Sequence, residues 1–426
     1  MTMSLCPARR RAAALLCVPL LAGLAACAGT GEEAADGRIT LTVDTFGTFG
    51  YRSLIREYEK AHPEVHVVER VRAFDEHHSA LTEALDTGTG AGDVVAVEEN
   101  YVVQFRTRAD DFVNLLDLGA GKKKDNWLRW KWDATLTADG SAQIGLGTDV
   151  GGLAMCYRPD LFAQAGLPTD RDAVAELWPT WADYIEAGKR FNVAQLPAAW
   201  TDSADNLYNQ ILAQQTYGYY DRDENLIMER DPGVRTAWNT AIQMVDANQS
   251  AKYKPFSAQW VAALQGARFA TLTCPAWFLG WIQENAPASR AQWDVTTVPG
   301  GAGNWGGSWL TVPRQSAHPR EAYRLAAWLT APEQQLRVFR ETGNLPSTPQ
   351  LYDDPAVTGY RSAFFRDAPV GKIYTAAANR KPAQYLGLRN AAARDIVTGM
   401  LSKVETGELT PYRAWKQATA QVRALP

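Results

Sequence analysis

Histidine and cysteine are scarce in this chain of 426 residues, which contains five of each. His77 and His78 are adjacent, so they lack the four-residue spacing of a helical zinc site, and no third ligand is evident. We therefore expect no metal site and no cofactor. The chain also lacks a GxSxG nucleophile elbow. Its glycine-rich TGTGAG, residues 87–92, lacks the Lys-Ser/Thr of a phosphate loop and precedes a strand, so it is interpreted as a turn.

A strong charge of one sign is also missing. The net charge is −4, which gives no electrostatic reason to expect nucleic-acid binding. In contrast, aromatic residues are abundant, with 15 Trp and 16 Tyr. Many of these rings will lie in the core, but such a count also favours surfaces on which ligands stack. With 46% hydrophobic residues, a chain of this length can bury a substantial core and is expected to form two lobes.

The N-terminal segment contains an apolar run, Ala12–Leu24, that is too short to span a membrane and follows three arginines. This pattern predicts a signal peptide over residues 1–26. The run ends in LAAC, which resembles a bacterial lipobox with Cys27 as the lipidated residue and residues 27–37 as a flexible tether. The alternative is an ordinary signal peptide in which Cys27 is incidental. The lipobox predicts export and lipid anchoring to the outer face of the bacterial cytoplasmic membrane.

Only two cysteines, Cys156 and Cys274, remain in the body of the protein. An oxidising compartment would allow them to pair. Both lie in apolar, strand-like runs, where a free thiol behaves as a small hydrophobic group. The sequence thus favours two buried thiols and leaves the disulfide open.

Strand and helix signals alternate in the first part of the body. The order is β-α-β-α-β, which implies a parallel sheet covered by helices, with a ligand crevice at the carboxyl ends of the strands. The loops at 44–50 and 98–101 would open at that edge. The expected elements are a strand at 39–47, a helix at 51–63, a strand at 65–71, a helix through 78–85 and a strand at 94–99.

A second set of elements follows Gly140. Residues 141–168 give a strand, a glycine-rich crossing, another strand and a helix. The chain is then rich in helix signals up to Asp294, where a strand returns. The stretch EAYRLAAWLTAPEQQLRVF, residues 321–339, is predicted to be one strong helix, and the chain after Pro346 is again helical.

A series of motifs occurs in a characteristic order after the lipobox: GLGTDVGGLAMCYRPDLFAQAGLP, PTWADYIEAGKRF, TLTCPAWFLGWI and NWGGSWLTVP, followed by the helix AYRLAAWLT. Together they resemble the extracellular solute-binding proteins of carbohydrate ABC importers. The resemblance implies a two-lobed α/β fold like that of periplasmic binding proteins, with hinge-crossing strands and a ligand cleft between the lobes. It places the N-lobe at residues 38–147 and 299–345, and the C-lobe at 148–298 and 346–426.

The same resemblance implies that the protein binds a di- or oligosaccharide and hands it to ABC permease subunits. It would act without catalysis, as a monomer, and a cello- or xylo-oligosaccharide is the expected ligand. The alternative is an exported glycoside hydrolase, which needs two carboxyl groups facing each other across the scissile bond. Glu98 and Glu99 are expected to be adjacent in a strand and to point to opposite faces, although a distant pair stays possible.

A sugar site needs aromatic planes together with polar groups that bind hydroxyls. Trp200, Trp277 and Trp305 are the expected cleft tryptophans, and similar relatives stack sugars from the positions matching Trp277 and Tyr385. Within NWGGSW, the glycines would let the backbone approach the sugar, whereas Trp309 would face the core. Trp277 could instead be a core residue, and Asp149 could merely cap a turn. The other candidates are Phe46, Glu98, Glu99, Asn100, Asp149, Asp202, Gly306, Ser308 and Arg389, the last expected on the same helical face as Tyr385.

Overall fold

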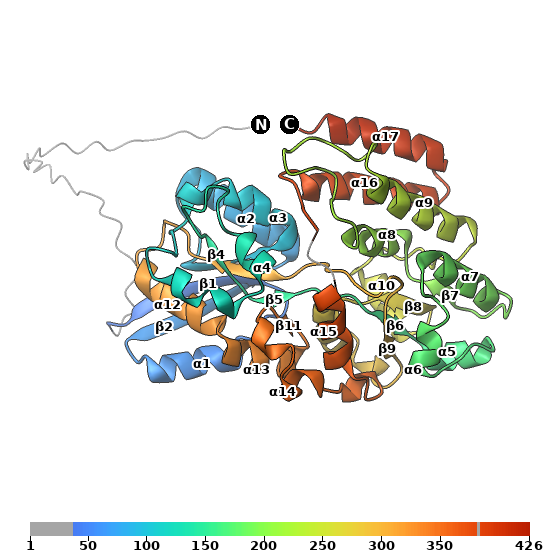
Figure 1. Ribbon diagram of the computed structural model, residues 1–426, viewed down its shortest axis with the longest axis horizontal. Helices are drawn as coiled ribbons and strands as arrows, with labels where there is room; N and C mark the ends of the chain where they lie inside the picture. The colour runs from blue at the N-terminus through green and yellow to red at the C-terminus, as the bar shows by residue number, and fades with distance from the viewer. Residues whose placement is uncertain (1–36, 381–383) are drawn as a thin grey trace, which may run out of the picture. The chain divides into compact units, whose positions relative to one another are not determined.

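The computed structural model describes residues 37–380 and 384–426. The predicted signal peptide at 1–26 and Cys27 lie outside the described residues, as does the predicted tether up to residue 36. No helix in the part described is long and apolar enough to cross a bilayer. Figure 1 shows two groups of strands, each flanked by helices.

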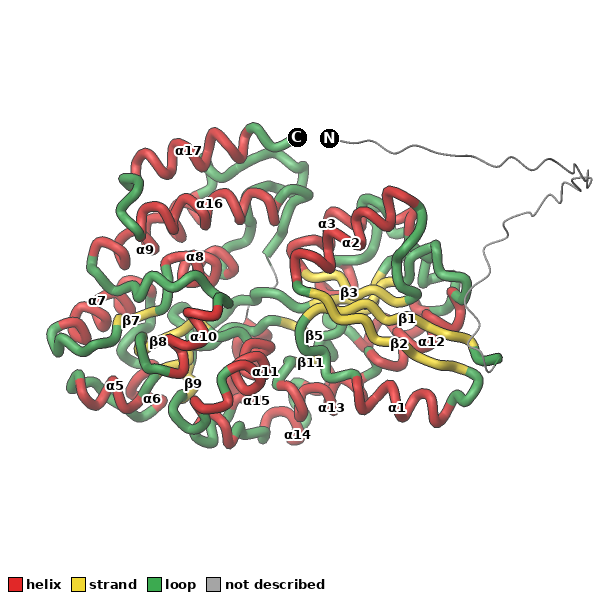
Figure 2. The backbone as a smooth tube through the Cα atoms, turned by 180° about the vertical axis from the view of Figure 1, so that it is seen from behind, coloured by secondary structure: helices red, strands yellow, loops and turns green. Residues whose placement is uncertain are grey.

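The first sheet has five strands in the order β2-β1-β3-β10-β4. β1 pairs in parallel with β2 and β3, which confirms the predicted βαβαβ arrangement, and β10 is antiparallel to both β3 and β4. Helices α2 and α3 lie on one side of this sheet, and α1 and α12 (Pro319–Leu329) on the other (Figure 2). The strands are β1 (Ile39–Phe46), β2 (Val65–Arg72), β3 (Val94–Glu98), β4 (Gly145–Gly147) and β10 (Ser308–Thr311), and the first helices are α1 (Arg52–Ala61), α2 (Phe74–Thr87), α3 (Glu99–Arg106) and α4 (Arg129–Asp133).

Strand β3 shows why helices cover both faces of this sheet. All five of its residues are buried. Val94 and Ala96 belong to the hydrophobic cluster that includes α1 and α12, whereas Val95 and Val97 belong to the cluster that includes α2 and α3. Because successive strand residues point to opposite faces, a strand that is apolar throughout requires a cover on each side.

The second sheet has four strands in the order β7-β8-β6-β9. β7 is parallel to β8, and β6 is antiparallel to β8 and β9. Helices make up most of the remaining chain. The strands are β6 (Met155–Tyr157), β7 (Ala199–Thr201), β8 (Phe269–Thr273) and β9 (Asp294–Thr296), and the helices are α5 (Pro159–Gln164), α6 (Arg171–Ala175), α7 (Trp181–Asn192), α8 (Ala204–Ala213), α9 (Pro232–Asp246), α10 (Ala258–Gln265), α11 (Ala276–Asn285), α14 (Pro355–Thr358), α15 (Val370–Arg380), α16 (Asn390–Glu405) and α17 (Pro411–Arg423).

Three chain segments run side by side between the sheets. β5 (Asp149–Val150) pairs with β11 (Leu345–Pro346), and the backbone of Trp305 donates to the carbonyl of Gly151 at 2.9 Å. A Cβ atom on Gly151 would lie 1.8 Å from the carbonyl oxygen of Trp305, so only glycine fits there. The glycine-rich crossing predicted at GTDVGG is therefore a point of backbone contact.

The helix predicted over residues 321–339 is two helices, α12 (Pro319–Leu329) and α13 (Pro332–Thr342). Pro332 is the first residue of α13, and Ala331 before it has an extended backbone with ψ of 153°. Proline lacks an N–H and disfavours helical geometry in the residue before it, so a helix ends and a new one begins.

Cys156 and Cys274 form a disulfide bond, so the preference for free thiols was wrong. Cys156 lies in β6, opposite Leu272 of β8, and Cys274 directly follows β8. This antiparallel pairing brings the two Cα atoms to 5.8 Å, within the range that a disulfide can bridge. Pairing over 118 residues depends on the tertiary fold, which strand-like patterns alone do not reveal.

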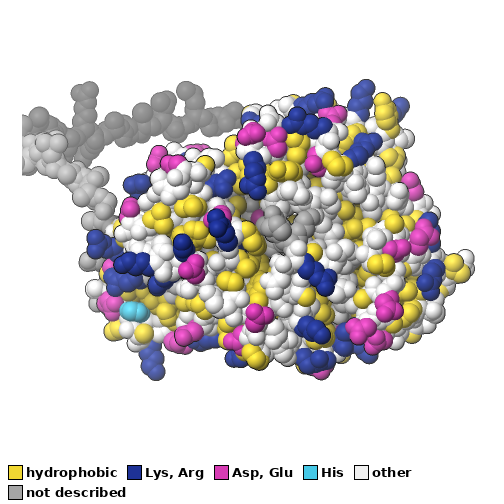
Figure 3. All heavy atoms as spheres, in the orientation of Figure 1, with side chains coloured by type: hydrophobic (Ala, Val, Ile, Leu, Met, Phe, Trp, Pro, Cys, Tyr) yellow, Lys and Arg dark blue, Asp and Glu magenta, His cyan; other side chains and the backbone are white. Residues whose placement is uncertain are grey.

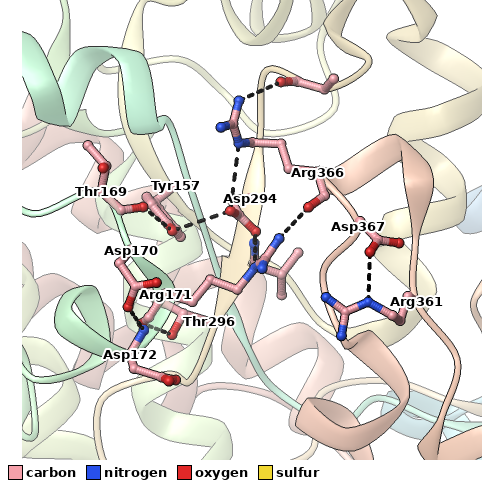
Figure 4. A network of polar contacts seen from close by, with 12 residues as sticks. Tyr157, Thr169, Asp170, Arg171, Asp172, Asp294, Thr296, Arg361, Arg366 and Asp367 are labelled. Atoms are coloured by element: carbon pink, nitrogen blue, oxygen red, sulfur yellow. Dashed lines mark hydrogen bonds and ion pairs between the residues drawn. The ribbon is translucent and has the colours of Figure 1, made fainter.

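A buried carboxylate secures the edge of the second sheet. Asp294 opens β9 and forms an ion pair with Arg171, whose Nε lies 2.6 Å from Oδ1. Figure 4 shows that Asp294 also faces Tyr157 and Arg366, the latter in the turn at 362–368. Because Asp294 contacts both Arg171 and Arg366, the network holds this turn and the start of α6 against the sheet. Loss of either arginine would leave the buried carboxylate with less compensating charge.

Candidate functional site

The carboxyl end of β3 meets the first residue of α3 at Glu98 and Glu99. Glu98 ends the strand and caps the helix, because its carboxylate accepts from the backbone N–H of Asn100 at 2.8 Å. The expectation that both glutamates lie in one strand was therefore wrong. Asn100 also receives a hydrogen bond of 3.1 Å from Asn390 at the start of α16, which joins segments 290 residues apart.

Glu99 is buried and accepts two hydrogen bonds of 2.8 Å, from the side chain of Asn304 and from the backbone N–H of Gly306. Burial, together with the nearby charge of Glu98, raises the pKa of Glu99 to about 8. The Glu99 carboxyl is consequently mostly neutral at pH 7. It fastens the start of α3 to the NWGGSW stretch.

Lys131 is a site residue that sequence reasoning missed. It is fully buried, its Nζ has no hydrogen-bond partner among the described residues, and Nζ lies 3.4 Å from the centre of the Trp309 ring. Burial lowers the pKa of Lys131 to about 8, although the charges of Asp149, Glu99 and Glu98 oppose this shift. The signal in the sequence was WKW, residues 130–132, a lysine between two large aromatic residues.

The glycines of NWGGSW are explained by contacts within the protein. Gly306 and Gly307 have positive φ angles of 84° and 100°. A Cβ on Gly306 would lie 2.9 Å from the indole nitrogen of Trp277, and one on Gly307 would lie 2.7 Å from the carbonyl oxygen of Asp149. These contacts differ from the predicted close approach of the backbone to a sugar.

Trp305 and Trp277 face each other across this turn, and both are partly exposed. Trp277 donates to the carbonyl of Trp305 at 2.9 Å, and the ring centres are 5.7 Å apart. Asp149 and Ser308 connect the crossing strand to β10, since the backbone N–H of Ser308 donates to Asp149 at 3.0 Å. Phe46, at the end of β1, is partly exposed and packs against Phe74.

Trp200 and Asp202 do not lie on a cleft wall, so these two predictions were wrong. Trp200 is fully buried among aromatic rings, with Phe162 and Tyr184 at 5.4 and 5.1 Å. Asp202 is fully buried and accepts from the indole of Trp260 at 2.9 Å. Burial raises the pKa of Asp202 to about 7. Helices cover the edge strand β7, which places both residues in the core.

Tyr385 and Arg389 do not share a helical face, contrary to the prediction. Residues 384–389 are not helical, and α16 begins only at Asn390. Tyr385 donates from its hydroxyl to Glu224 at 2.6 Å. Arg389 is exposed and interacts with Tyr220 instead.

A cavity of about 210 Å³ brings together residues far apart in the chain. Of the predicted site residues, it includes Glu99 and Tyr385, and Trp309 also lines it although it is 1% exposed. In the space-filling view, apolar side chains are visible between charged ones along the middle of the face shown (Figure 3). The further lining residues, which sequence reasoning missed, are Val102, Val103, Arg106, Trp130, Asp133, Ala134, Arg222, Gln384 and Leu386.

The aromatic and polar side chains around the cavity favour binding of a polar molecule with a flat face. Trp130 and Tyr385 offer aromatic faces, and the Glu99 carboxyl and the amide oxygen of Gln384 offer hydrogen-bonding groups. The amide nitrogen of Gln384 already donates to the carbonyls of Leu212 and Tyr217. Within the described ranges, no group of three or more His, Cys, Asp or Glu side chains could hold a metal ion.

The chain matches a known protein family. The sequence profile of the bacterial extracellular solute-binding proteins matches residues 53–364 of the chain. A curated relative from Bacillus subtilis (strain 168), an arabinooligosaccharide-binding protein, is 26% identical over 332 residues, which cover 72% of this chain and 73% of the relative.

Solved structures are also similar to this fold. The crystal structure of an extracellular solute-binding protein of family 1 has a TM-score of 0.81 and 42% identity, and the match covers 89% of this chain and 98% of that one. An ABC transporter associated binding protein from B. animalis subsp. lactis Bl-04, in complex with β-1,6-galactobiose, has a TM-score of 0.76 at 20% identity, covering 90% and 96% of the two chains. Both matches show the two-lobed α/β fold.

Proposed function

Since the chain belongs to the family of bacterial extracellular solute-binding proteins, we propose that it binds a di- or oligosaccharide between its lobes and delivers it to a membrane ABC permease. The observation that carries the proposal is the cavity, in which aromatic faces lie beside Glu99 and Gln384. A sugar that contacts both lobes binds the closed state better than the open one and shifts the population toward it. The relative that binds arabino-oligosaccharides supports this ligand class.

The proposed ligand-binding residues line the cavity, lie near the ends of β1, β3 and β10, or belong to the segments that pack against these ends. Trp200, Asp202 and Arg389 are no longer included, because their contacts place them elsewhere. The lobes are proposed to be 38–147 with 299–345 and 148–298 with 346–426, and the membership of the two sheets supports this division. The retained residues are Phe46, Glu98, Glu99, Asn100, Asp149, Trp277, Trp305, Gly306, Ser308 and Tyr385.

We propose binding without catalysis, by a monomer, with a cello- or xylo-oligosaccharide as ligand. The relatives are binding proteins of transporters. A glycoside hydrolase would need two carboxyl groups free to act on the bond. The carboxyl groups of Glu98 and Glu99 instead bind backbone N–H groups of Asn100 and Gly306, which favours a structural and recognition role.

A thermal-shift screen over a panel of oligosaccharides tests the proposed function. A cognate sugar at 100 times its Kd is expected to add about 2.7 kcal/mol to the free energy of unfolding. Tyr385→Ala should weaken binding by roughly 1–3 kcal/mol in calorimetric titration, since it removes a stacking face. Tyr412→Ala is the control, because Tyr412 is 76% exposed and lines no part of the cavity. A panel in which no sugar raises the melting temperature would refute the proposal.

We also propose that Cys27 carries the lipid anchor. The support is the LAAC motif and membership of an extracellular family, which implies export. The wild-type protein should fractionate with membranes, and Cys27→Ala should release it or leave it unprocessed. Mass spectrometry of the mature N-terminus checks the modification. A wild-type protein that is soluble in the medium and unlipidated would contradict the anchor.

A further inference from the structure

Two guanidinium groups that line the cavity have no acidic partner in the part of the chain that the structure describes. The only hydrogen bond of the Arg106 side chain within the described residues is a long one, 3.4 Å from Nη1 to the carbonyl of Ala134. The guanidinium carbon of Arg222 lies 5.2 Å from the centre of the Tyr385 ring. Arg108 and Arg230 form ion pairs with Asp86 and Asp221, whereas neither cavity arginine pairs with a carboxylate of the described chain. Burial and the neighbouring Glu224 raise the pKa of the Tyr385 hydroxyl to about 12. The positive charges of both arginines partly oppose this shift.

The nearby carboxylates are committed to other partners. Asp133, which also lines the cavity, pairs with Arg129 at 3.4 Å. Glu224, two residues after Arg222, accepts from the Tyr385 hydroxyl at 2.6 Å and from the backbone of Leu388 at 2.8 Å. Asp221 pairs with Arg230 at 3.1 Å.

The other acid that lines the cavity, Glu99, carries little negative charge at neutral pH, since burial raises its pKa to about 8. Asp133 is partly balanced by Arg129. An excess of positive charge therefore faces the cavity, from α3 on one side and from the segment before α9 on the other.

We propose that the sugar held in this cavity carries a carboxylate, as a uronic acid residue does, and that Arg106 and Arg222 bind it. This inference rests on the proposed function and names the ligand class for the same site. A guanidinium donates planar, charge-assisted hydrogen bonds that match a carboxylate. The aromatic faces of Trp130 and Tyr385 serve the sugar ring that carries it.

The size of the cavity fits one acidic ring of a longer ligand. Its volume of about 210 Å³ is below the roughly 300–1,000 Å³ of a complete small-molecule site. The rest of the oligosaccharide would extend from the cavity toward Trp277 and Trp305, which are both partly exposed.

The test compares two ligands that differ in one group. The first is a xylo-oligosaccharide bearing one glucuronic acid residue, and the second is the same molecule with that carboxyl reduced to the alcohol. Wild-type protein should bind the acidic form roughly tenfold to hundredfold more tightly in calorimetric titration, and added salt should reduce this preference. Arg106→Gln and Arg222→Gln should each lose most of it. Arg190→Gln, on α7 and away from the cavity lining, should keep it.

The outcomes separate this inference from the function on which it rests. Equal or tighter binding of the reduced ligand by the wild type would overturn the acidic ligand while leaving oligosaccharide binding intact. An unchanged preference in both glutamine variants would overturn the role of the two arginines. Absence of binding for both ligands, and for every neutral sugar of the panel, would refute the proposed function itself. Thermal melts of each variant confirm that it is folded.

Discussion

Replacing both Cys156 and Cys274 by alanine is expected to lower the free energy of unfolding by about 4–5 kcal/mol. The bond closes a loop of 118 residues, and in the chain-entropy account a loop of about 100 residues is stabilised by about 4.7 kcal/mol. Both residues are fully buried in the hydrophobic cluster that includes β6 and β8, and the alanines preserve its apolar character. Urea denaturation of the variant and the oxidised wild type measures the difference.

Reduced wild-type protein is the matched control for the disulfide, because it keeps both sulfur atoms and loses only the bond. It should lose nearly as much stability as the double variant, with the remainder due to packing. A loss of less than about 1 kcal/mol in both cases would contradict a stabilising role for the bond.

The second large effect is expected for Trp309→Ala, which should cost roughly 3–5 kcal/mol of stability. Trp309 is 1% exposed, and its indole donates to the carbonyl of Lys131 at 2.8 Å. Its ring also faces the Lys131 ammonium at 3.4 Å. The alanine variant therefore leaves a cavity and also removes the cation–π contact of a buried charge.

Two further variants isolate the cause of the Trp309 effect. Trp309→Phe retains a ring beside Lys131 and should recover a large part of the loss. Trp305→Ala, at a partly exposed position, should melt close to the wild type. Chemical denaturation and thermal melts follow all three. If Trp305→Ala proved as destabilising as Trp309→Ala, the distinction between a surface ring and a core ring in NWGGSW would be wrong.

Local patterns predicted the first sheet well. The alternation in β1, the amphipathic helix α1 and the apolar run of β3 each depend on neighbours in the sequence, and such signals are independent of the rest of the chain. The break at Pro332 was also a local signal, and the sequence analysis missed it because the flanking hydrophobic pattern continues through it.

The candidate site was predicted less well because its geometry is not local. Trp200 and Trp305 are both tryptophans next to polar residues, and only the packing of β7 under helices shows that the first is fully buried. Tyr385 and Arg389 have helical spacing, yet the backbone of Tyr385 instead hydrogen-bonds to Thr216. The cavity arginines were missed for the same reason, since nothing near them in the sequence marks them as neighbours of Tyr385.

The position of β10 in the first sheet has a consequence for how the protein folds. β10 lies between β3 and β4, although Ser308–Thr311 follow both of these strands by more than 150 residues. A chain that emerges N-terminus first therefore has an unpaired β3 edge until β10 arrives. Such long-range pairing is intrinsically slow, and an open strand edge invites aggregation. For an exported protein, this topology favours a chain that stays unfolded until most of it has crossed the membrane, and it makes folding after export the step most exposed to misassembly.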